Sequence, residues 1–474
     1  MTGTGATKLG SPEDSPRSLK RAALAVSCLA SFMTPYLSSA VSIALPTIGR
    51  EFGMSAASLG WVSTAFLVSA AACLLPFGSV ADMIGRRRLF LVGVALYTLF
   101  CALASIAPGG AALIAAVALI GASAAMIFGT GVAILTSVYP PAERGRVLGI
   151  NVAFTYAGLS LGPLLGGVLT RSLGWRSVYL LNVPVGLATL AVVLIGLRGE
   201  WRGESGRRFD LVGSLISASS LACLVWGLSL LPAVRGFILV AASAACLALF
   251  VLQEGRATNP LLSLGLFRGN RVFGMSNLAA LINYSATFAL TFFMSLYFQV
   301  VKGMGPDLAG LILMAQPVVM VIFSPIAGRL SDRHEPQLLA SIGMAIMAVM
   351  LGLLATLGPR TALLPIVLDL MAVGTGYAFF SSPNTNAVMG SVPPRHYGIA
   401  SATLGTMRLV GQMLSMGIAM LMLSLSLGRR PVGPALSREV LQGMRLCFAI
   451  FTALCVAGVF ASLARGKRIR DPGR

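Results

Sequence analysis

Long apolar blocks, separated by short polar segments, constrain this chain of 474 residues more than any other feature. Hydrophobic residues make up 56% of the sequence and charged residues 11%, and the mean hydropathy is +0.86. A soluble domain has about 25% charged residues, because its surface must be covered with groups that bind water. Apolar runs of about 20 residues can cross the hydrocarbon core of a bilayer as helices. The sequence therefore predicts an all-α integral membrane protein.

Fourteen apolar segments are candidate membrane spans. The segment at 236–253 is short, whereas its partner at 211–232 contains no charged residue. The predicted spans lie near residues 22–48, 58–80, 89–107, 111–138, 148–170, 177–197, 211–232, 236–253, 273–298, 306–328, 337–358, 361–388, 398–424 and 446–464.

The distribution of basic residues predicts the orientation. An even number of spans places both termini on one side of the membrane. If that side is the cytoplasm, the cytoplasmic segments carry more than twice as many Lys and Arg residues as the outside segments. We therefore expect a multi-pass protein of the plasma or inner membrane with both termini in the cytoplasm. The polar N-terminal residues precede an apolar run of full spanning length, so a cleavable signal is not expected.

A short internal repeat predicts the domain organisation. The sequence Gly78-Ser-Val-Ala-Asp82 after the second span is matched by Gly328-Arg-Leu-Ser-Asp332 after the tenth. Repeated halves are common in transporters, and the offset between the copies exceeds six helix-plus-loop units by about two helices. We predict an N-terminal tail at 1–21, a six-helix bundle at 22–200, an inserted two-helix hairpin at 201–256, a second six-helix bundle at 257–466 and a C-terminal tail at 467–474.

Several function classes are disfavoured by composition. The net charge is +20, but the basic residues stand at the ends of apolar blocks and form no patch interleaved with aromatics, so no nucleic-acid partner is expected. The seven cysteines all fall within apolar runs, which suits packing. The two histidines are far apart, and no nucleotide-binding loop or nucleophile motif occurs. We expect no enzyme activity, metal or cofactor, and a monomer whose partners are the bilayer, a small-molecule substrate and protons.

The loop after the second span carries a gating motif. It reads Gly78-Ser-Val-Ala-Asp82-Met-Ile-Gly85-Arg86-Arg87-Arg88 and resembles the G-x-x-x-D-x-x-G-R-[RK]-[RK] signature of the major facilitator superfamily. Gly78 permits close helix approach, and Asp82 can meet a helix N-terminus and basic side chains of the opposite half. Together with Gly328 and Asp332, the motif is expected to latch the cytoplasmic side shut in one state. A plain positively charged loop is the alternative.

The fifth span resembles the antiporter signature of the same superfamily, which occurs mainly among exporters. Gly158 and Gly162 lie one turn apart on one face, which allows tight packing against a neighbouring helix, and Pro163 supplies a kink. The same packing is expected to seal or hinge the pathway, and small-residue packing alone is the alternative. The motif consists of Gly149, Gly158, Gly162, Pro163, Gly166 and Gly167, spaced as G-x8-G-x3-G-P-x2-G-G.

Further stretches make the chain after residue 20 similar to the fourteen-helix drug:proton antiporter group. They are Ala44-Leu45-Pro46, Gly174-Trp175-Arg176, Leu181-Asn182-Val183-Pro184, Phe209-Asp210-Leu211-Val212-Gly213 and Arg408-Leu-Val-Gly411. The resemblance implies two six-helix bundles, two extra central helices and exchange of a drug for protons by alternating access. Two positions depart from the group's pattern, because Leu37 replaces its usual Asp in the first span and Val117 replaces its usual Arg in the fourth.

Two charged residues, Asp369 and Arg408, lie deep within apolar sequence. From the helical rise, Asp369 is about 12 Å from one boundary of the bilayer core and Arg408 about 15 Å from the other, so both fall near the midplane. Charges there are costly and tend to pair or to serve function. We predict that Asp369 is the protonatable or cation-sensing group and that Arg408 adjusts its proton affinity or orientation. A structural ion pair between them is the alternative.

Polar and aromatic residues within the spans are candidates for lining a substrate cavity. Together they suit a large, weakly polar substrate, although each alone is also suited to packing or to an interhelical hydrogen bond. They are Tyr36, Asn151, Tyr156, Asn283, Tyr284, Phe288, Gln316, Asn384 and Asn386.

The sequence favours a secondary active exporter of small amphipathic or cationic compounds, of multidrug type, driven by proton exchange. A second interpretation is an exporter or facilitator of a specific metabolite, lipid or organic anion without the usual proton coupling. The replacements at Leu37 and Val117 and the charge of Arg408 support that interpretation. A third is a non-transporting membrane sensor or scaffold, against which the two motifs argue.

Overall fold

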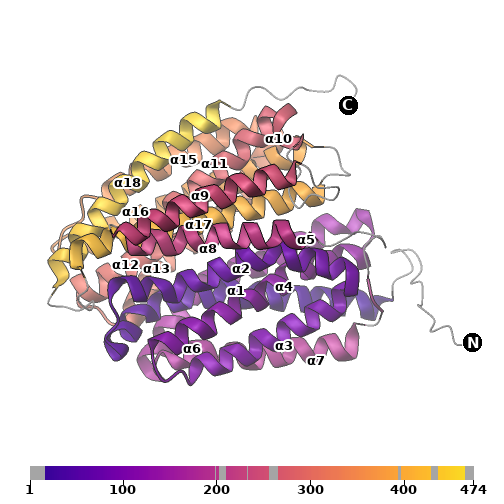
Figure 1. Cartoon of the computed structure of the whole chain (residues 1–474), viewed down its shortest axis with the longest axis horizontal. Coiled ribbons are helices and arrows are strands. Elements are labelled where there is room, and N and C mark those ends of the chain that lie inside the picture. The colour runs from indigo at the N-terminus through magenta and orange to yellow at the C-terminus, as the bar shows by residue number, and fades with distance from the viewer. Residues whose placement is uncertain are drawn as a thin grey trace, which may run out of the picture.

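A computed structural model describes residues 16–197, 199–201, 210–231, 233–255, 265–392, 397–428 and 436–464, and its elements are helices (Figure 1). The N-terminal part contains α1 (Arg17–Phe52), α2 (Ala56–Ile84), α3 (Arg86–Ser105), α4 (Gly110–Val138), α5 (Pro141–Ser172), α6 (Arg176–Leu180) and α7 (Asn182–Gly196). Two further helices, α8 (Leu211–Leu230) and α9 (Val234–Glu254), follow. The C-terminal part contains α10 (Gly265–Gly269), α11 (Arg271–Thr287), α12 (Leu290–Leu296), a π-helical turn η2 (Tyr297–Val301), α13 (Pro306–Leu313), α14 (Ala315–Arg333), α15 (Pro336–Leu354), α16 (Leu363–Gly390), α17 (Tyr397–Leu427) and α18 (Ser437–Leu463).

Twelve helical segments among the described residues are long and apolar enough to cross a membrane. They account for all the predicted spans except 58–80 and 211–232, where the described apolar stretches Ser58–Leu74 and Val212–Leu228 are shorter. The prediction of a multi-pass, all-helical membrane protein is therefore confirmed. The number of fourteen spans stays a prediction.

Local sequence determines several helix ends. The side-chain oxygens of Ser55, Asp210 and Asn270 accept hydrogen bonds from backbone N–H groups in the first turns of α2, α8 and α11. Proline stands in the first turn of α5, α13 and α15, where its missing N–H leaves no helical bond unmade. Gly85 links α2 to α3 with φ of 109°, a left-handed conformation that a residue with a Cβ avoids.

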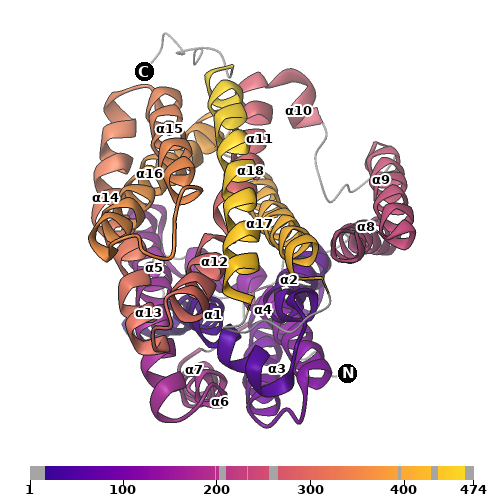
Figure 2. The ribbon, with the colours of Figure 1, turned by 90° about the vertical axis from the view of Figure 1, so that its left-hand side faces the viewer.

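The helices pack as two halves with the same pattern of neighbours (Figure 2). In the N-terminal half, α1 packs against α5 and α7, α4 packs against α2 and α3, and α3 packs against α7. In the C-terminal half, α11 packs against α17 and α18, α16 packs against α14 and α15, and α15 packs against α18. The same contacts occur in both halves when the helices are matched in chain order. The series α1, α2, α3, α4, α5 and α7 then corresponds to α11, α14, α15, α16, α17 and α18.

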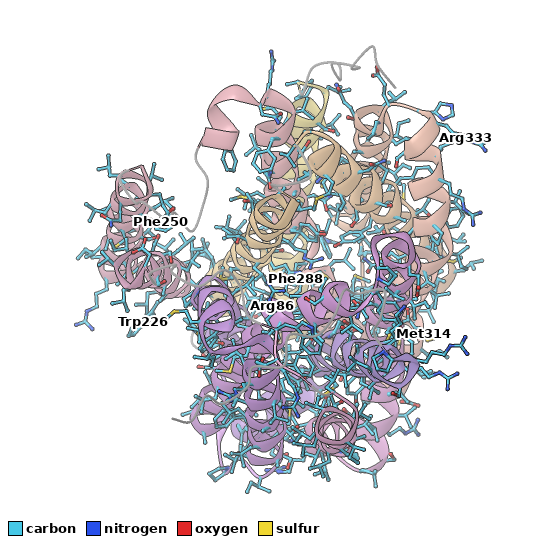
Figure 3. The ribbon with its side chains drawn as sticks, turned by 90° about the vertical axis from the view of Figure 1, so that its right-hand side faces the viewer. Arg86, Trp226, Phe250, Phe288, Met314 and Arg333 are labelled. Carbon is cyan, nitrogen blue, oxygen red and sulfur yellow. The ribbon has the colours of Figure 1, made fainter. Side chains whose placement is uncertain are left out.

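The α8–α9 hairpin lies beside both halves. Figure 3 shows its residues Trp226 and Phe250 to one side of the other helices. The two helices are joined by reciprocal hydrogen bonds in which Ser220 Oγ donates to the Ser243 carbonyl at 3.0 Å and Ser243 Oγ donates to the Ser220 carbonyl at 2.8 Å. Helix α8 contacts α2 of the N-terminal half and α17 of the C-terminal half. The hairpin therefore covers one side of the seam between the halves.

Helix α5 packs on α1 through glycines. A Cβ added to Gly158 would lie 2.5 Å from the Phe32 carbonyl oxygen, and one added to Gly162 would lie 2.6 Å from Ser39 Cβ. A Cβ on Gly166 would lie 2.7 Å from Ala40 Cα. These distances are too short for any side chain, so the two backbones approach directly over two turns.

Replacement of Gly158 by alanine is expected to lower the stability of the protein. The new methyl group meets backbone, which yields less readily than a side chain, and overpacking of this kind costs about 1–3 kcal/mol. Gly352→Ala in α15 is the matched control, because there a Cβ makes only an ordinary contact with Thr452 and gains helix propensity. Thermal unfolding in detergent measures both. An unfolding temperature of Gly158→Ala at or above that of Gly352→Ala would contradict the prediction.

Candidate functional site

The two halves touch closely at the end of the molecule where α5 ends and α13 begins. We call the end at which α1 begins and α18 ends the terminal end, and the opposite end, at which α5 ends and α13 begins, the distal end (Figure 1). At the distal end, α5 meets α13 with almost no space between the backbones. A Cβ on Gly167 would clash with the Pro306 carbonyl, and a Cβ on Gly310 would clash with the Pro163 carbonyl.

Polar contacts accompany this approach. Arg171 at the end of α5 forms an ion pair with Asp307 at the start of α13. Gln299 in η2 donates from Nε2 to the Ile43 carbonyl of α1 at 2.9 Å. Both interactions join the N-terminal half to the C-terminal half, and both lie at the distal end. The distal end is therefore closed in this structure.

At the terminal end, the described part of the gating motif contacts its own half and the segment after α7. The Arg86 backbone N–H donates to the Trp201 carbonyl, and the Arg87 N–H donates to Glu200 Oε1, each at 2.8 Å. Glu200 Oε2 lies 3.7 Å from Arg88 Nε. A carboxylate at the start of α3 satisfies unpaired N–H groups and opposes the helix dipole.

Glu200 was missed by sequence reasoning, because an acidic residue in a polar linker carries no local signal of its partner. The predicted latch between the gating motif and the opposite half is not formed among the described residues. Gly78 faces open space, and Gly328 packs near Ser382 of its own half. Three motif residues, Asp82, Gly149 and Asp332, lie outside the residues whose side-chain surroundings the structure describes.

Halfway between the two ends, an arginine and three tyrosines from both halves come together. Arg408 lies near the middle of α17, with its guanidinium carbon 5.9 Å from the ring centre of Tyr284 in α11. The Tyr284 ring meets that of Tyr377 in α16 edge to face, at a centroid distance of 5.7 Å. Tyr156, from α5 of the N-terminal half, lies within electrostatic range of Tyr284 and Arg408. We call these four residues the interbundle site.

The side chain of Arg408 is exposed, although it stands more than ten residues from either end of its helix. Its neighbours come from α11, α16 and α5, so its exposure is to the space between the two halves. Gly411, one turn further along α17, brings that helix against the backbone of α11 at Leu281. This close approach places Arg408 over Tyr284. Phe288 follows Tyr284 by one turn of α11 and lies where the halves meet (Figure 3).

Asp369 and Arg408 do not form an ion pair. Asp369 is 8% exposed, and neither of its carboxylate oxygens has a hydrogen-bond partner among the described residues. It shares a face of α16 with Gly376, two turns away, and Gly376 packs against Gly343 and Met347 of α15. Asp369 therefore points into the C-terminal half rather than toward the interbundle site.

Most of the other predicted cavity residues join helices within one half. Asn151 donates to Ser31 Oγ of α1 at 2.8 Å, and Asn386 donates to Ser331 Oγ of α14 at 3.0 Å. Asn283 contacts Met347, the backbone of Gln316 packs against Gly374, and Tyr36 is buried and stacks on Phe32. Of the nine candidates, the structure thus brings Tyr156 and Tyr284 together with Arg408. Asn384 is 2% exposed, and its Oδ1 has no hydrogen-bond partner in the part of the chain that the structure describes. It lies two turns from Tyr377 on the same face of α16.

Comparison with known proteins now decides the family, because residues 27–416 match the model of the Major Facilitator Superfamily. The chain belongs to this superfamily. It is accordingly a multi-pass membrane transporter of small molecules and not an enzyme.

Three relatives illustrate the range within the superfamily. The riboflavin transporter RibZ of Clostridioides difficile is 29% identical over 81% of this chain and 84% of the relative. The cephamycin export protein CmcT of Amycolatopsis lactamdurans is 33% identical over 88% of this chain and 87% of the relative. The multidrug efflux pump LfrA of Mycolicibacterium smegmatis is 30% identical over 81% and 77%.

Among solved structures, a bacterial homologue of the human lysosomal transporter Spinster, in an inward-facing and unoccupied conformation, shares the fold. It superposes with a TM-score of 0.70 at 18% identity, covering 95% of this chain and 98% of that chain.

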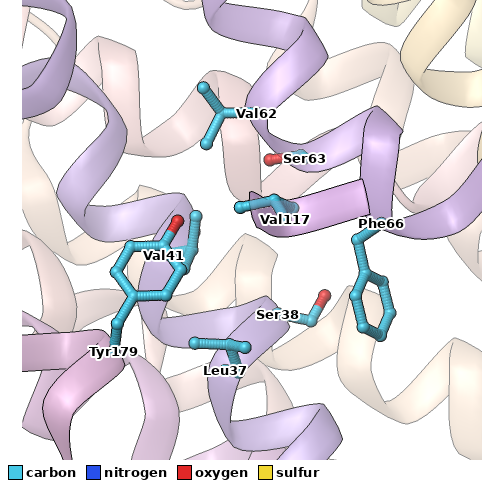
Figure 4. A pocket seen from close by; sticks show the side chains of 8 residues that line it. All are labelled: Leu37, Ser38, Val41, Val62, Ser63, Phe66, Val117 and Tyr179. Carbon is cyan, nitrogen blue, oxygen red and sulfur yellow. The ribbon is translucent and has the colours of Figure 1, made fainter. Parts of the chain in front are cut away.

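Within this member of the superfamily, Leu37 and Val117 line one small pocket inside the N-terminal half (Figure 4). The lining of the pocket contains no carboxylate and no basic side chain. The hydroxyl oxygens of Ser63 and Tyr179 have no hydrogen-bond partner among the described residues. The two residues that depart from the antiporter pattern thus lie together, and they leave this half without the usual charged pair. The lining consists of Leu37, Ser38, Val41, Val62, Ser63, Phe66, Val117 and Tyr179.

Asp307→Asn is expected to weaken the closure of the distal end. Loss of the ion pair with Arg171 removes an attraction between the halves, and a solvent-exposed pair is worth about 1 kcal/mol or less. The population open at the distal end should rise up to about fivefold. Leu180 and Leu364 are exposed residues of the two halves at that end. Spin labels on cysteines introduced at these two positions report the opened population as longer distances in double electron–electron resonance.

Glu51→Gln is the matched control for this experiment. It removes an ion pair at the same end, with Arg176 at 2.6 Å, but both partners belong to the N-terminal half. Equal distance distributions for Asp307→Asn and Glu51→Gln would show that the Arg171–Asp307 pair does not hold the halves together.

Proposed function

We propose that this protein is a secondary active exporter of small amphipathic compounds, of multidrug type, that works by alternating access. The observation that supports this most directly is the arrangement of the halves. Two bundles with the same internal packing meet through backbone contacts at one end, and between them an exposed arginine and three tyrosines lie at half height. Rocking of the bundles about such a site would expose it to each side of the membrane in turn.

The proposed topology places both termini in the cytoplasm and the protein in the plasma or inner membrane, as a monomer. In that orientation the distal end is extracellular, and this structure is an inward-facing state. Helices α2 and α8 complete fourteen spans, with six-helix bundles at 22–200 and 257–466 and the hairpin at 201–256 between them. The packing of α2 on α4, and of α8 on both halves, supports this division.

The two motifs take complementary roles in this proposal. The antiporter motif on α5 seals the extracellular end, since Pro163 and Gly167 contact α13 there. The gating motif, with Asp82, Arg86 and Arg87, latches the cytoplasmic end when the halves rock the other way. Its described residues contact Glu200 and Trp201 in the present state, which leaves the opposite half free to separate.

Proton coupling is assigned to Asp369 without a contribution from Arg408. An ionised carboxylate that is buried without a partner is strongly disfavoured, so Asp369 is expected to hold a proton while it is buried. A conformation that exposes Asp369 to water would let it release that proton. In the N-terminal half, the pocket lined by Leu37 and Val117 has no carboxylate among its lining residues. The acidic group that the antiporter pattern usually carries in the first span is therefore replaced in function by one in α16.

Transport by purified protein in proteoliposomes tests the proposal. We expect the pH gradient to drive uptake of an amphipathic dye into vesicles with the transporter inside out, and we expect collapse of the gradient to abolish it. Failure to move any dye, with or without a gradient, in a correctly inserted preparation would favour the sensor or scaffold interpretation.

Asp369→Asn should separate transport from its driving force. The amide cannot release a proton, so accumulation against a gradient should fall to the level seen without a pH difference, whereas dye counterflow at equal pH should persist. Glu335→Gln, which removes an exposed carboxylate at the terminal end, should leave both unchanged. Accumulation by Asp369→Asn that still follows the pH gradient would remove Asp369 from the coupling mechanism.

A further inference from the structure

The charge of the interbundle site bears on which compounds the exporter accepts. Arg408 is the charged residue of the site, and no carboxylate lies within 4 Å of it among the described residues. Asp369 is eight residues from Tyr377 along α16, about 12 Å by the helical rise, and it faces α15. The positive charge is therefore not neutralised by a described acidic side chain.

A cation near the middle of a membrane protein is costly unless water, a partner or a ligand compensates it. Here the side chain is exposed to the space between the halves, so water compensates it when no ligand is bound. The tyrosine ring below it adds only a weak interaction, because a centroid distance of 5.9 Å is at the limit of effective contact. Arg408 also interacts through a side-chain hydrogen bond with Tyr284, but a guanidinium has five N–H donors, so donors remain available to a ligand.

The surrounding groups suit one kind of ligand. A guanidinium presents a planar fork of donors that matches a carboxylate or another planar, delocalised anion, and the tyrosine hydroxyls of the site can donate to the same group. The edge-to-face pair of Tyr284 and Tyr377, with Phe288 one turn along α11, offers ring surfaces to an aromatic body. The buried Asn384 Oδ1, which has no partner among the described residues and lies two turns from Tyr377, adds an acceptor on the same face.

We propose that the interbundle site binds the acidic group of amphipathic aromatic compounds through Arg408 and the hydroxyls of Tyr284, Tyr377 and Tyr156, and so makes this exporter prefer anions to cations. This inference rests on the proposed function and names its substrate class. It departs from the preference for cationic compounds that the sequence suggested, because a cation in this site would meet a like charge and find no described carboxylate.

Tyr156 gives the site a way to distinguish the two states of the carrier. It belongs to the N-terminal half, whereas Arg408, Tyr284 and Tyr377 belong to the C-terminal half. A ligand held by Arg408 and Tyr156 together therefore bridges the halves. Separation of the halves at this level would remove one of its contacts and weaken binding.

The test compares two dyes of the same three-ring shape and opposite charge, fluorescein and rhodamine 123. Binding to the full chain in nanodiscs is followed by fluorescence anisotropy, with empty nanodiscs subtracted. We expect fluorescein to bind more tightly than rhodamine 123, and we expect Arg408→Gln to weaken fluorescein binding about ten- to hundredfold while strengthening rhodamine 123. Arg408→Lys should retain part of the fluorescein affinity.

Two further variants guard against a general loss of folding. Tyr156→Phe removes one hydroxyl and should weaken fluorescein binding about three- to tenfold with no effect on rhodamine 123. Arg445→Gln removes a positive charge at the distal end, where its Nε donates to the Leu357 carbonyl, and should leave both affinities unchanged. Absence of fluorescein binding, or equal fluorescein affinities in the unaltered chain and Arg408→Gln, would overturn the proposal.

Transport of the same dyes in proteoliposomes keeps this inference separate from the proposed function. Fluorescein binding that depends on Arg408 without transport of either dye would support the anion site and count against export. Transport of both dyes at rates that ignore Arg408→Gln would support export and overturn the anion site.

Discussion

The structure depends on the contact that α5 makes with two helices at once. One face of α5, with Gly158, Gly162 and Gly166, lies on α1 of its own half, and the adjacent positions Pro163 and Gly167 lie on α13 of the other half. In a bilayer, lipid solvates apolar side chains as well as protein does, so close van der Waals packing of backbones carries much of the association between helices. Van der Waals attraction falls steeply with distance, so a small separation of the halves is enough to lose the contact between α5 and α13.

This arrangement gives α5 different attachments on its two sides. Its contact with α1 extends over two turns, whereas its contact with α13 is confined to the distal end and is supplemented by the exposed Arg171–Asp307 pair. The first suits a permanent joint within a bundle, and the second suits a closure that opens. At the terminal end, Glu200 holds the segment after α7 against the start of α3, so the described contacts of that loop stay within the N-terminal half.

Charge is distributed unequally between the two halves. In the N-terminal half, Leu37 and Val117 surround an apolar pocket, and the contribution to the interbundle site is Tyr156. In the C-terminal half, Asp369 and Arg408 occupy different surroundings, one buried between helices and the other exposed to the space between the halves. Because they do not meet, each has to be compensated separately, and in our proposal one handles a proton and the other a ligand.

The sequence by itself determined the helical membrane fold, because a bilayer leaves few ways to satisfy the hydrogen bonds of the backbone and the length of an apolar run is therefore decisive. It also determined the family and the motifs that mark the two halves. The spacing of Gly158 and Gly162 also determined that one face of α5 could approach another helix. Only the tertiary structure decided which end of the molecule is closed, that Glu200 contacts the gating motif, and that Arg408 joins tyrosines instead of Asp369. Each of these features is a contact between different parts of the chain. The 3.6-residue period shows which residues share a face of one helix, but not which other helix that face contacts.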